Sequence, residues 1–205
     1  MLIDEELIRN TYDYYLQDTE RTDVHNEWMD GVVPVVAATL AFGMGIDKQC
    51  VRFVAHWSVP QSVAEYYQES GRAGRDAKAS YARIFYSKKD RDTRITHLMQ
   101  DQIKAKTEIS RNTKEAVVDS FKIMVKYCES DNCRHAVISK FFGDNRPNCV
   151  KNCDVCFDKQ SVQERLEIFK VIGTQSDQER NMDVNNDSAK LELMNVLKEK
   201  IFCKS

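Results

Sequence analysis

The chain has 205 residues, of which 42% are hydrophobic and 30% charged, and its formal net charge is −2 at pH 7. This balance is that of a folded globular protein with one ordinary domain and a smaller one, and it excludes a long disordered tail as the main feature. It also excludes a global positive field, so any contact with nucleic acid would have to come from local basic patches.

The N-terminal residues, the lack of long apolar runs and the cysteine count indicate the cellular compartment in which the chain is expected to work. The first ten residues, MLIDEELIRN, lack the apolar segment of a signal peptide, and no apolar run approaches the ~20 residues that cross a bilayer. We therefore expect an intracellular protein without membrane contact, where thiols stay reduced. In that setting the seven cysteines, an odd number, indicate a metal site more than a disulfide framework.

The first half of the chain has the pattern of an α/β lobe. Residues 1–18 carry apolar side chains near the helical period, and a second helix is predicted from residue 19 or 20 to residue 30, followed by Gly31. A further helix is predicted at 62–72. Short apolar runs rich in β-branched residues lie at 32–39, 51–57 and 82–86. Such runs, separated by helix-length stretches, are typical of a parallel sheet covered on both faces.

The second half is predicted to be helical and to end in a polar segment. Residues 90–142 carry three apolar stripes at helical spacing, closed by Gly143. Residues 174–187 have almost no apolar side chains and predict a linker. Residues 191–202 predict a short amphipathic helix that could dock or bind a protein partner. The expected organisation is thus four segments, at 1–18, 19–89, 90–158 and 159–205.

Four cysteines have the spacing of a metal site. They form the pattern C-x15-C-x3-C-x2-C and are Cys133, Cys149, Cys153 and Cys156. Zinc prefers four soft ligands at the corners of a tetrahedron, and a closely spaced pair can supply two of them from one turn. We predict a closed, structural zinc site, with His135 pointing elsewhere on its helix. The alternatives are buried cysteines with a chance pair, or a redox C-x-x-C.

A second constellation places two arginines near an amide. In the stretch YYQESGRAGRD, which begins at Tyr66, the side chains of Gln68, Arg72 and Arg75 would share one face of a helix. Two glycines within that stretch are unfavourable in a helix and suggest close approach by another body. Two guanidinium groups suit a phosphate whose charge must be stabilised. The alternative is an exposed helix whose arginines pair with neighbouring carboxylates.

A glycine-containing loop follows the first predicted strand. Residues 39–48 read TLAFGMGIDK, and in open α/β sheets ligands bind beyond the carboxyl ends of the strands. Glycines let backbone amides approach a phosphate closely. The loop therefore predicts a phosphate or nucleotide contact, with a tight turn that buries Phe42 and Met44 as the alternative.

These motifs resemble the RecQ family of superfamily-2 DNA helicases. Residues 38–48 resemble helicase motif V, residues 66–76 resemble motif VI, and the four cysteines, together with the segments CRH at 133–135 and FFGD at 141–144, resemble the RecQ zinc module. The resemblance runs from about Glu20 to Phe157 and is similar to the type of RecQ helicase that lacks the winged helix. It implies a partial RecA-like parallel-sheet lobe followed by a helical zinc-binding subdomain.

The family resemblance also implies roles for individual residues. The family couples ATP hydrolysis to 3′→5′ movement on single-stranded DNA, so ATP with Mg²⁺, DNA and a structural zinc ion are the expected ligands, and the nucleus is the expected compartment. Arg75 would be the arginine finger, with Arg72 beside it and Gln68 coupling the nucleotide to DNA. Gly45 and Asp47 would lie near the nucleotide. DNA contacts are expected from Thr39, Met44 and Lys48.

The chain also departs from the family pattern. Because no glycine is followed by lysine, the 205 residues contain no phosphate-binding G-K-[ST] loop. We expect that loop to belong to a first motor lobe that these residues lack, so the chain alone is predicted to be inactive. Ala77 stands where the family usually has glycine. The rival hypotheses are a non-enzymatic zinc-stabilised module that binds DNA or protein, perhaps as a short form regulating a full-length helicase, and a remnant of an RNA helicase.

Overall fold

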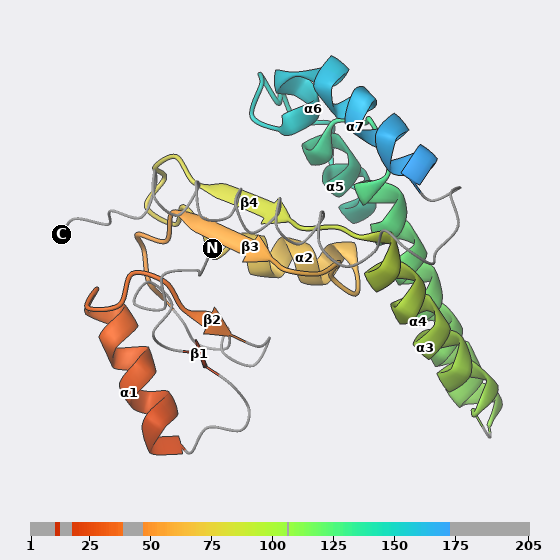
Figure 1. The fold of residues 1–205 in the computed structure, drawn as a ribbon, viewed down its shortest axis with the longest axis horizontal. Coiled ribbons are helices and arrows are strands. Elements are labelled where there is room, and N and C mark those ends of the chain that lie inside the picture. Colours follow the sequence, from red (N-terminus) through yellow and green to blue (C-terminus); the bar gives the residue numbers. More distant parts are fainter. Residues whose placement is uncertain (1–10, 13–17, 39–46, 106, 173–205) are drawn as a thin grey trace. The chain divides into compact units, whose positions relative to one another are not determined.

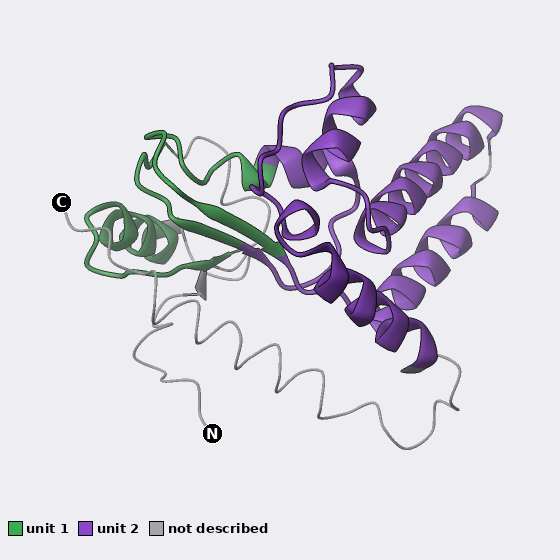
Figure 2. Ribbon diagram, turned by 90° about the horizontal axis from the view of Figure 1, so that it is seen from above, with its two compact units in different colours: residues 1–54, 69–83, 180–205 green, residues 55–68, 84–179 purple. Residues whose placement is uncertain are grey.

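The computed structural model describes residues 11–12, 18–38, 47–105 and 107–172 (Figure 1). The chain divides into two compact units, drawn in different colours in Figure 2. One comprises Met1–Val54, Glu69–Arg83 and Arg180–Ser205, and the other comprises Ala55–Gln68 and Ile84–Glu179. None of the helices within the described ranges is long and apolar enough to cross a membrane.

Among its described residues, the first unit contains a small parallel strand pair and helix α1. Strand β1 (Thr11–Tyr12) pairs in parallel with β2 (Ala37–Ala38), and helix α1 (Asp18–Met29) lies between them in the chain. The helix predicted over residues 1–18 is therefore wrong at Thr11 and Tyr12. Their backbone groups bond to a strand 26 positions further along, and a local apolar period cannot report so distant a partner.

Helix α1 is followed by Gly31 as predicted, and Lys48 makes an additional contact to the end of this helix. Gly31 has φ +78°, the left-handed conformation that glycine adopts without a steric penalty after a helix. The ammonium group of Lys48 donates hydrogen bonds to the carbonyl oxygens of Trp28 and Met29, the latter at 3.0 Å. A cation at this position also interacts favourably with the helix dipole.

Strands β3 (Phe53–His56) and β4 (Tyr81–Ile84) flank helix α2 (Val63–Ser70), as the predicted order strand, helix, strand requires. They run in parallel, since Tyr81 N bonds to Arg52 O at 3.0 Å and Phe85 N bonds to His56 O at 2.8 Å. The mixed α/β class with parallel strands is confirmed. The prediction that the strands are covered on both faces is wrong within the described residues, because β2 is exposed and β3 and β4 are half-buried or exposed.

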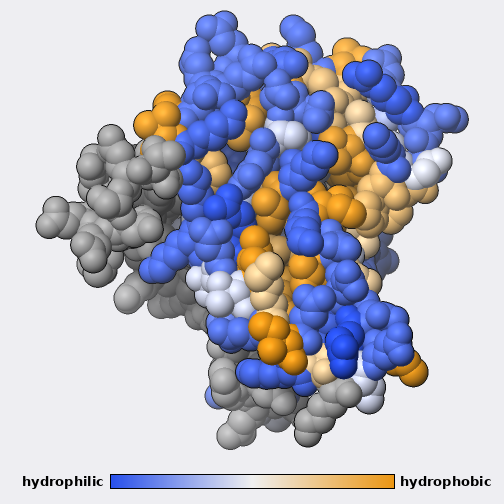
Figure 3. Space-filling view, turned by 90° about the vertical axis from the view of Figure 1, so that its right-hand side faces the viewer, coloured by the Kyte–Doolittle hydropathy of each residue, from blue (hydrophilic) through white to orange (hydrophobic). Residues whose placement is uncertain are grey.

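The second unit is built on a helical hairpin. Helices α3 (Lys88–Ile103) and α4 (Glu108–Cys128) begin at Ser87 and Thr107, whose side chains accept hydrogen bonds from backbone amides of their first turns. The apolar stripes predicted for this region form one core with α2, and its buried members are Val59, Val63, Tyr66, Leu98, Val118, Phe121, Met124 and Tyr127. Figure 3 shows that the outer apolar surface on this side is divided into narrow strips by hydrophilic side chains.

Three shorter helices follow the hairpin. Helix α5 (Arg134–Phe142) ends at Gly143, which has φ +77°, and the loop after it leads to α6 (Asp154–Phe157). Helix α7 (Lys159–Ile172) lies in the predicted segment 159–205, of which only residues 191–202 were expected to be helical. Its inner residue Val162 is 3% exposed, and Phe169 packs on Tyr86 with ring centroids 5.4 Å apart.

Candidate zinc centre and arginine loop

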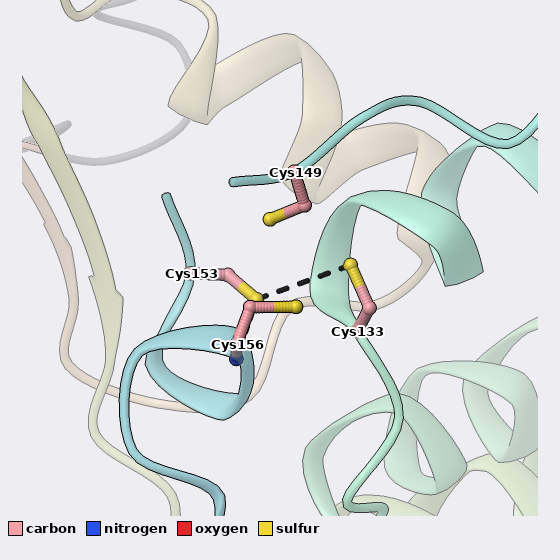
Figure 4. A group of neighbouring side chains, drawn as sticks. All are labelled: Cys133, Cys149, Cys153 and Cys156. Atoms are coloured by element: carbon pink, nitrogen blue, oxygen red, sulfur yellow. Dashed lines mark hydrogen bonds between the residues drawn. The ribbon is translucent and has the colours of Figure 1, made fainter. Parts of the chain in front are cut away.

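Four thiol groups converge at the start of α5 and around α6 (Figure 4). The sulfur atoms of Cys133, Cys149, Cys153 and Cys156 all lie within 4.8 Å of one another. Four sulfurs about 2.3 Å from a central zinc ion would be about 3.8 Å apart, so the cluster matches a tetrahedral thiolate site closely. The donor set is complete and soft, as a structural zinc ion requires.

Local backbone geometry explains how residues from three segments reach one point. Cys133 is the residue before the first turn of α5, and Cys153 is the corresponding residue of α6. The Cys153 sulfur accepts a hydrogen bond from Cys156 N at 3.4 Å, which orients the C-x-x-C pair. Between Cys149 and Cys153 the chain turns tightly, with Asn152 N bonded to Cys149 O at 2.7 Å.

Arg134, the residue after the first cysteine, forms hydrogen bonds that connect the segments around the zinc centre. Arg134 forms two hydrogen bonds to the carboxylate of Asp154, at 2.9 and 3.1 Å, and donates another to the carbonyl oxygen of Tyr127. Its guanidinium also lies over the Tyr127 ring, 5.4 Å from the centroid. Burial would raise the pKa of Asp154, but the hydrogen bonds and charge of Arg134 outweigh it and hold that pKa below its ordinary value. Arg134 therefore ties α4, α5 and α6 together.

Substituting Arg134 with lysine is expected to destabilise the folded chain by about 2 kcal/mol, because an ammonium group cannot reproduce the planar two-point contact and still reach the Tyr127 carbonyl. Asp154 remains 44% exposed, so water compensates part of the loss. Urea unfolding at neutral pH with zinc present measures the effect. Arg111→Lys, at an exposed position of α4, is the matched control and should change little. Equal stability of the two variants would contradict the role given to Arg134.

Two residues, His135 beside the zinc centre and Cys50 in the other unit, differ from expectation. His135 was predicted to point elsewhere, but its Nδ1 lies 3.0 Å from the Cys149 sulfur. That prediction is wrong because His135 lies in the first turn of α5, shortly after Cys133, and this turn faces the cysteine loop. Cys50, expected to be a reduced thiol like the other cysteines, is disulfide-bonded. Cys128 is free, and burial raises its pKa to about 12, which suits a packed thiol.

The arginine motif lies at the end of α2 and in the loop after it. Helix α2 stops at Ser70, so Gln68 is on the helix whereas Arg72 and Arg75 are in the following turns. The prediction that all three share one helical face is therefore wrong. After Ser70 the backbone tightens, with Arg72 N bonded to Glu69 O and Ala73 N to Ser70 O, both at 3.1 Å. Gly74, which has φ +74°, then directs its amide to Val51 O at 2.9 Å, away from a helical partner.

The loop is shaped by close contacts within its own unit. A side chain at Gly74 would place its Cβ 2.4 Å from Ser80 Oγ, so the approach that requires glycine here comes from the same loop. Ala77 has φ +60°, a left-handed conformation that costs a non-glycine residue roughly 1–2 kcal/mol and that accounts for the family's usual glycine. The Asp76 carboxylate is bound by Arg52, which also donates to the Ala79 carbonyl oxygen at 3.0 Å.

Arg52 is a positioning residue that the sequence did not single out. Its hydrogen bond to Asp76 is the main reason that the pKa of that carboxyl lies below its ordinary value. The side chain of Arg52 is only 18% exposed, and it connects the start of β3 to the loop that carries the arginines. An arginine inside the apolar run 51–57 does not indicate its partner from sequence, because that partner lies 24 positions away.

The structure brings two of the predicted nucleotide-site residues together. Arg75 Nη1 lies 2.8 Å from Asp47 Oδ1, with exposed fractions of 33% and 72% for the two side chains. Lys48, predicted to contact DNA, donates to the carbonyl oxygens of Trp28 and Met29 in this structure, and the DNA contact stays a prediction. The remaining predicted contacts lie outside the described residues, and they are Thr39, Met44 and Gly45.

Together these features define a class of protein: a helicase C-terminal lobe followed by a cysteine-rich zinc-binding domain. A family model described as helicase conserved C-terminal domain matches residues 5–77, and one described as RecQ zinc-binding matches residues 89–157. By these two matches the chain is similar to a C-terminal part of the RecQ-family helicases. Its zinc ion is structural and is held by the four cysteines.

Three named relatives are similar to about three quarters of the chain. The chain is 47% identical over 158 residues to the ATP-dependent DNA helicase Q5 of Rattus norvegicus, which is 76% of this chain and 16% of the relative. It is 41% identical over 159 residues to the RecQ-like DNA helicase BLM of Xenopus laevis, covering 73% of this chain and 11% of that protein. It is 37% identical over 155 residues to the ATP-dependent DNA helicase RecQ of Haemophilus influenzae, covering 75% and 24%. The chain thus spans a quarter or less of these proteins.

Proposed function

We propose that this chain forms the C-terminal part of the motor of an ATP-dependent 3′→5′ DNA helicase that acts in the nucleus in DNA unwinding, repair and recombination. The similar proteins from rat, Xenopus and Haemophilus, all ATP-dependent or RecQ-like DNA helicases, support this assignment. In this proposal ATP is held between the present lobe and a first lobe outside these 205 residues, and the zinc module stabilises the lobe that supplies the arginines.

The observation that carries the proposal is that Arg75 is paired with an exposed carboxylate on a well-fixed loop. Its guanidinium stands at the surface of a loop that is fixed by Gly74 and Arg52, and it is paired with the exposed carboxylate of Asp47. Exposed pairs of this kind contribute less than about 1 kcal/mol, so a triphosphate can displace the carboxylate at little cost. Arg75 would then stabilise charge on the transferred phosphoryl group, with Arg72 beside it.

Roles are also proposed for the residues around this loop. Gln68, exposed near the end of α2, would link the nucleotide to DNA, while Gly45 and Asp47 would lie close to the nucleotide. Thr39 and Met44 would touch the DNA backbone. Lys48 could join them only after leaving the carbonyl oxygens of α1, so its contribution is proposed to depend on that release.

The zinc module is proposed to brace the helix that carries Gln68. Tyr66 of α2, only 7% exposed, packs against Tyr127 of α4 with ring centroids 5.5 Å apart. The next residue, Tyr67, packs on Phe142 of α5 at 5.1 Å. Two consecutive aromatic side chains, which point in different directions from α2, thus contact the helices on either side of Cys133. This bracing supports a mechanical role for zinc rather than a chemical one.

A chimeric enzyme tests the proposal. The matched segment of the rat relative is replaced by the corresponding residues of this chain, and unwinding of a DNA fork with a 3′ single-stranded arm is followed by fluorescence. We expect ATP-dependent unwinding within about tenfold of the parent enzyme, and little activity on a fork with only a 5′ arm. A folded, zinc-loaded chimera that binds DNA but does not unwind it would overturn the proposal. The protein partner expected for residues 191–202 concerns a segment outside the described residues and stays a prediction.

A further inference from the structure

His135 lies beside the zinc centre and is not one of its four ligands, but a ring nitrogen of this histidine is directed at the sulfur of one ligand. Nδ1 of His135 lies 3.0 Å from the sulfur of Cys149, and Cys149 is 7% exposed and buried. His135 is in the first turn of α5, directly after Cys133 and Arg134. The positions of Cys133 and of the Arg134 contact to Asp154 fix the start of this turn, so the ring is held at the cysteine loop.

The chemistry of the two groups decides which of them donates. A zinc-bound cysteine is a thiolate, which has lone pairs and no proton, so it can only accept a hydrogen bond. The imidazole must therefore carry its proton on Nδ1 when zinc is bound. A fifth bond from the histidine to the metal is not required, because four thiolates already complete a tetrahedral structural site.

We propose that His135 is a positioning residue of the zinc centre, whose Nδ1–H donates a hydrogen bond to the Cys149 thiolate, fixes its orientation and lowers its reactivity toward electrophiles. Accepting a hydrogen bond draws electron density from the sulfur, and the thiolate is the reactive form of cysteine. Partners that orient metal ligands in this way typically change metal affinity by about 10–100-fold. Cys149 would consequently be the most protected of the four ligands.

The test separates the hydrogen bond from burial. The full-length chain, loaded with zinc, is treated with limiting N-ethylmaleimide, and the singly labelled fraction is mapped to individual cysteines by mass spectrometry. His135→Phe preserves a planar ring but removes the donor, whereas His135→Asn places an amide N–H near the position of Nδ1. His97→Phe, at an exposed position of α3, is the matched control.

The expected result is specific to one sulfur. His135→Phe should increase first labelling at Cys149 by about tenfold, with zinc release in step, and His135→Asn should restore the rate to within about threefold of the wild type. The control should match the wild type. An equal acceleration at all four cysteines, or none at Cys149, would overturn the proposal, as would X-ray absorption of the zinc-loaded wild type showing three sulfur ligands and one nitrogen.

Discussion

Replacing Cys153 with serine is expected to abolish zinc binding and to unfold the segment around α5 and α6. Cys153 supplies a metal ligand and also accepts the hydrogen bond from Cys156 N that shapes the C-x-x-C turn. Structural zinc sites contribute about 10–16 kcal/mol of apparent binding free energy at neutral pH, which is comparable to the whole stability of a domain. Metal analysis should fall from about one zinc per chain to none, and helicity by circular dichroism should decrease.

Cys128→Ala provides the control for this experiment. Cys128 is a largely buried thiol of α4 that is not among the clustered ligands, so its loss should leave the zinc content unchanged. Chelation of the wild type should reproduce the spectrum of Cys153→Ser, since both remove the metal. A Cys153→Ser protein with one zinc per chain and wild-type helicity would contradict the assignment of the zinc centre.

Arg75→Ala in the chimera is expected to reduce single-stranded-DNA-stimulated ATP hydrolysis by a factor of about 10³ or more. Arginine fingers contribute about 10³–10⁵ to phosphoryl transfer by stabilising the charge of the transition state. The loop geometry should survive the substitution, because it is held by Gly74 and by the Arg52–Asp76 contact and not by the Arg75–Asp47 pair. Steady-state phosphate release at saturating DNA gives the rate.

The comparison variant for Arg75 is Arg111→Ala, which removes an exposed arginine from α4, outside the motif. It should retain the rate of the parent chimera. Arg75→Ala should change the affinity for a nucleoside diphosphate far less than it changes turnover, because the proposed contact forms fully only in the transition state. Similar turnover for the two variants would remove Arg75 from the catalytic role.

The zinc centre was predictable because its information is local and chemical. Cysteine is the residue that supplies soft ligands, three of the four cysteines lie within eight positions, and no geometry beyond one turn was needed to group them. Helix α1 and its end at Gly31 were predicted for the same reason, from a short period and a glycine. The partners of Arg134, His135 and Arg52 were not predictable in this way, because each depends on how a helix or strand is rotated about its axis.

Other differences have particular causes. Helix α7 was missed although Val162, Leu166 and Phe169 lie at helical spacing, because the charged residues between them resembled the polar segment that follows. The strands were expected in one covered sheet, but pairing between strands is set by distant parts of the chain and not by apolar runs. The arginines were predicted on a helix, but α2 ends at Ser70 and tighter turns lead to Gly74, whose positive φ cannot be read from the sequence.

The most direct test of the central claim is phosphate release by the purified 205-residue chain with single-stranded DNA and MgATP. We propose that Arg72 and Arg75 act on a nucleotide bound by another lobe, because the 205 residues contain no G-K-[ST] loop. We therefore expect no turnover above background from the zinc-loaded chain, and turnover once the first lobe is joined to it. Turnover by the chain alone that is lost in Arg75→Ala would contradict the account.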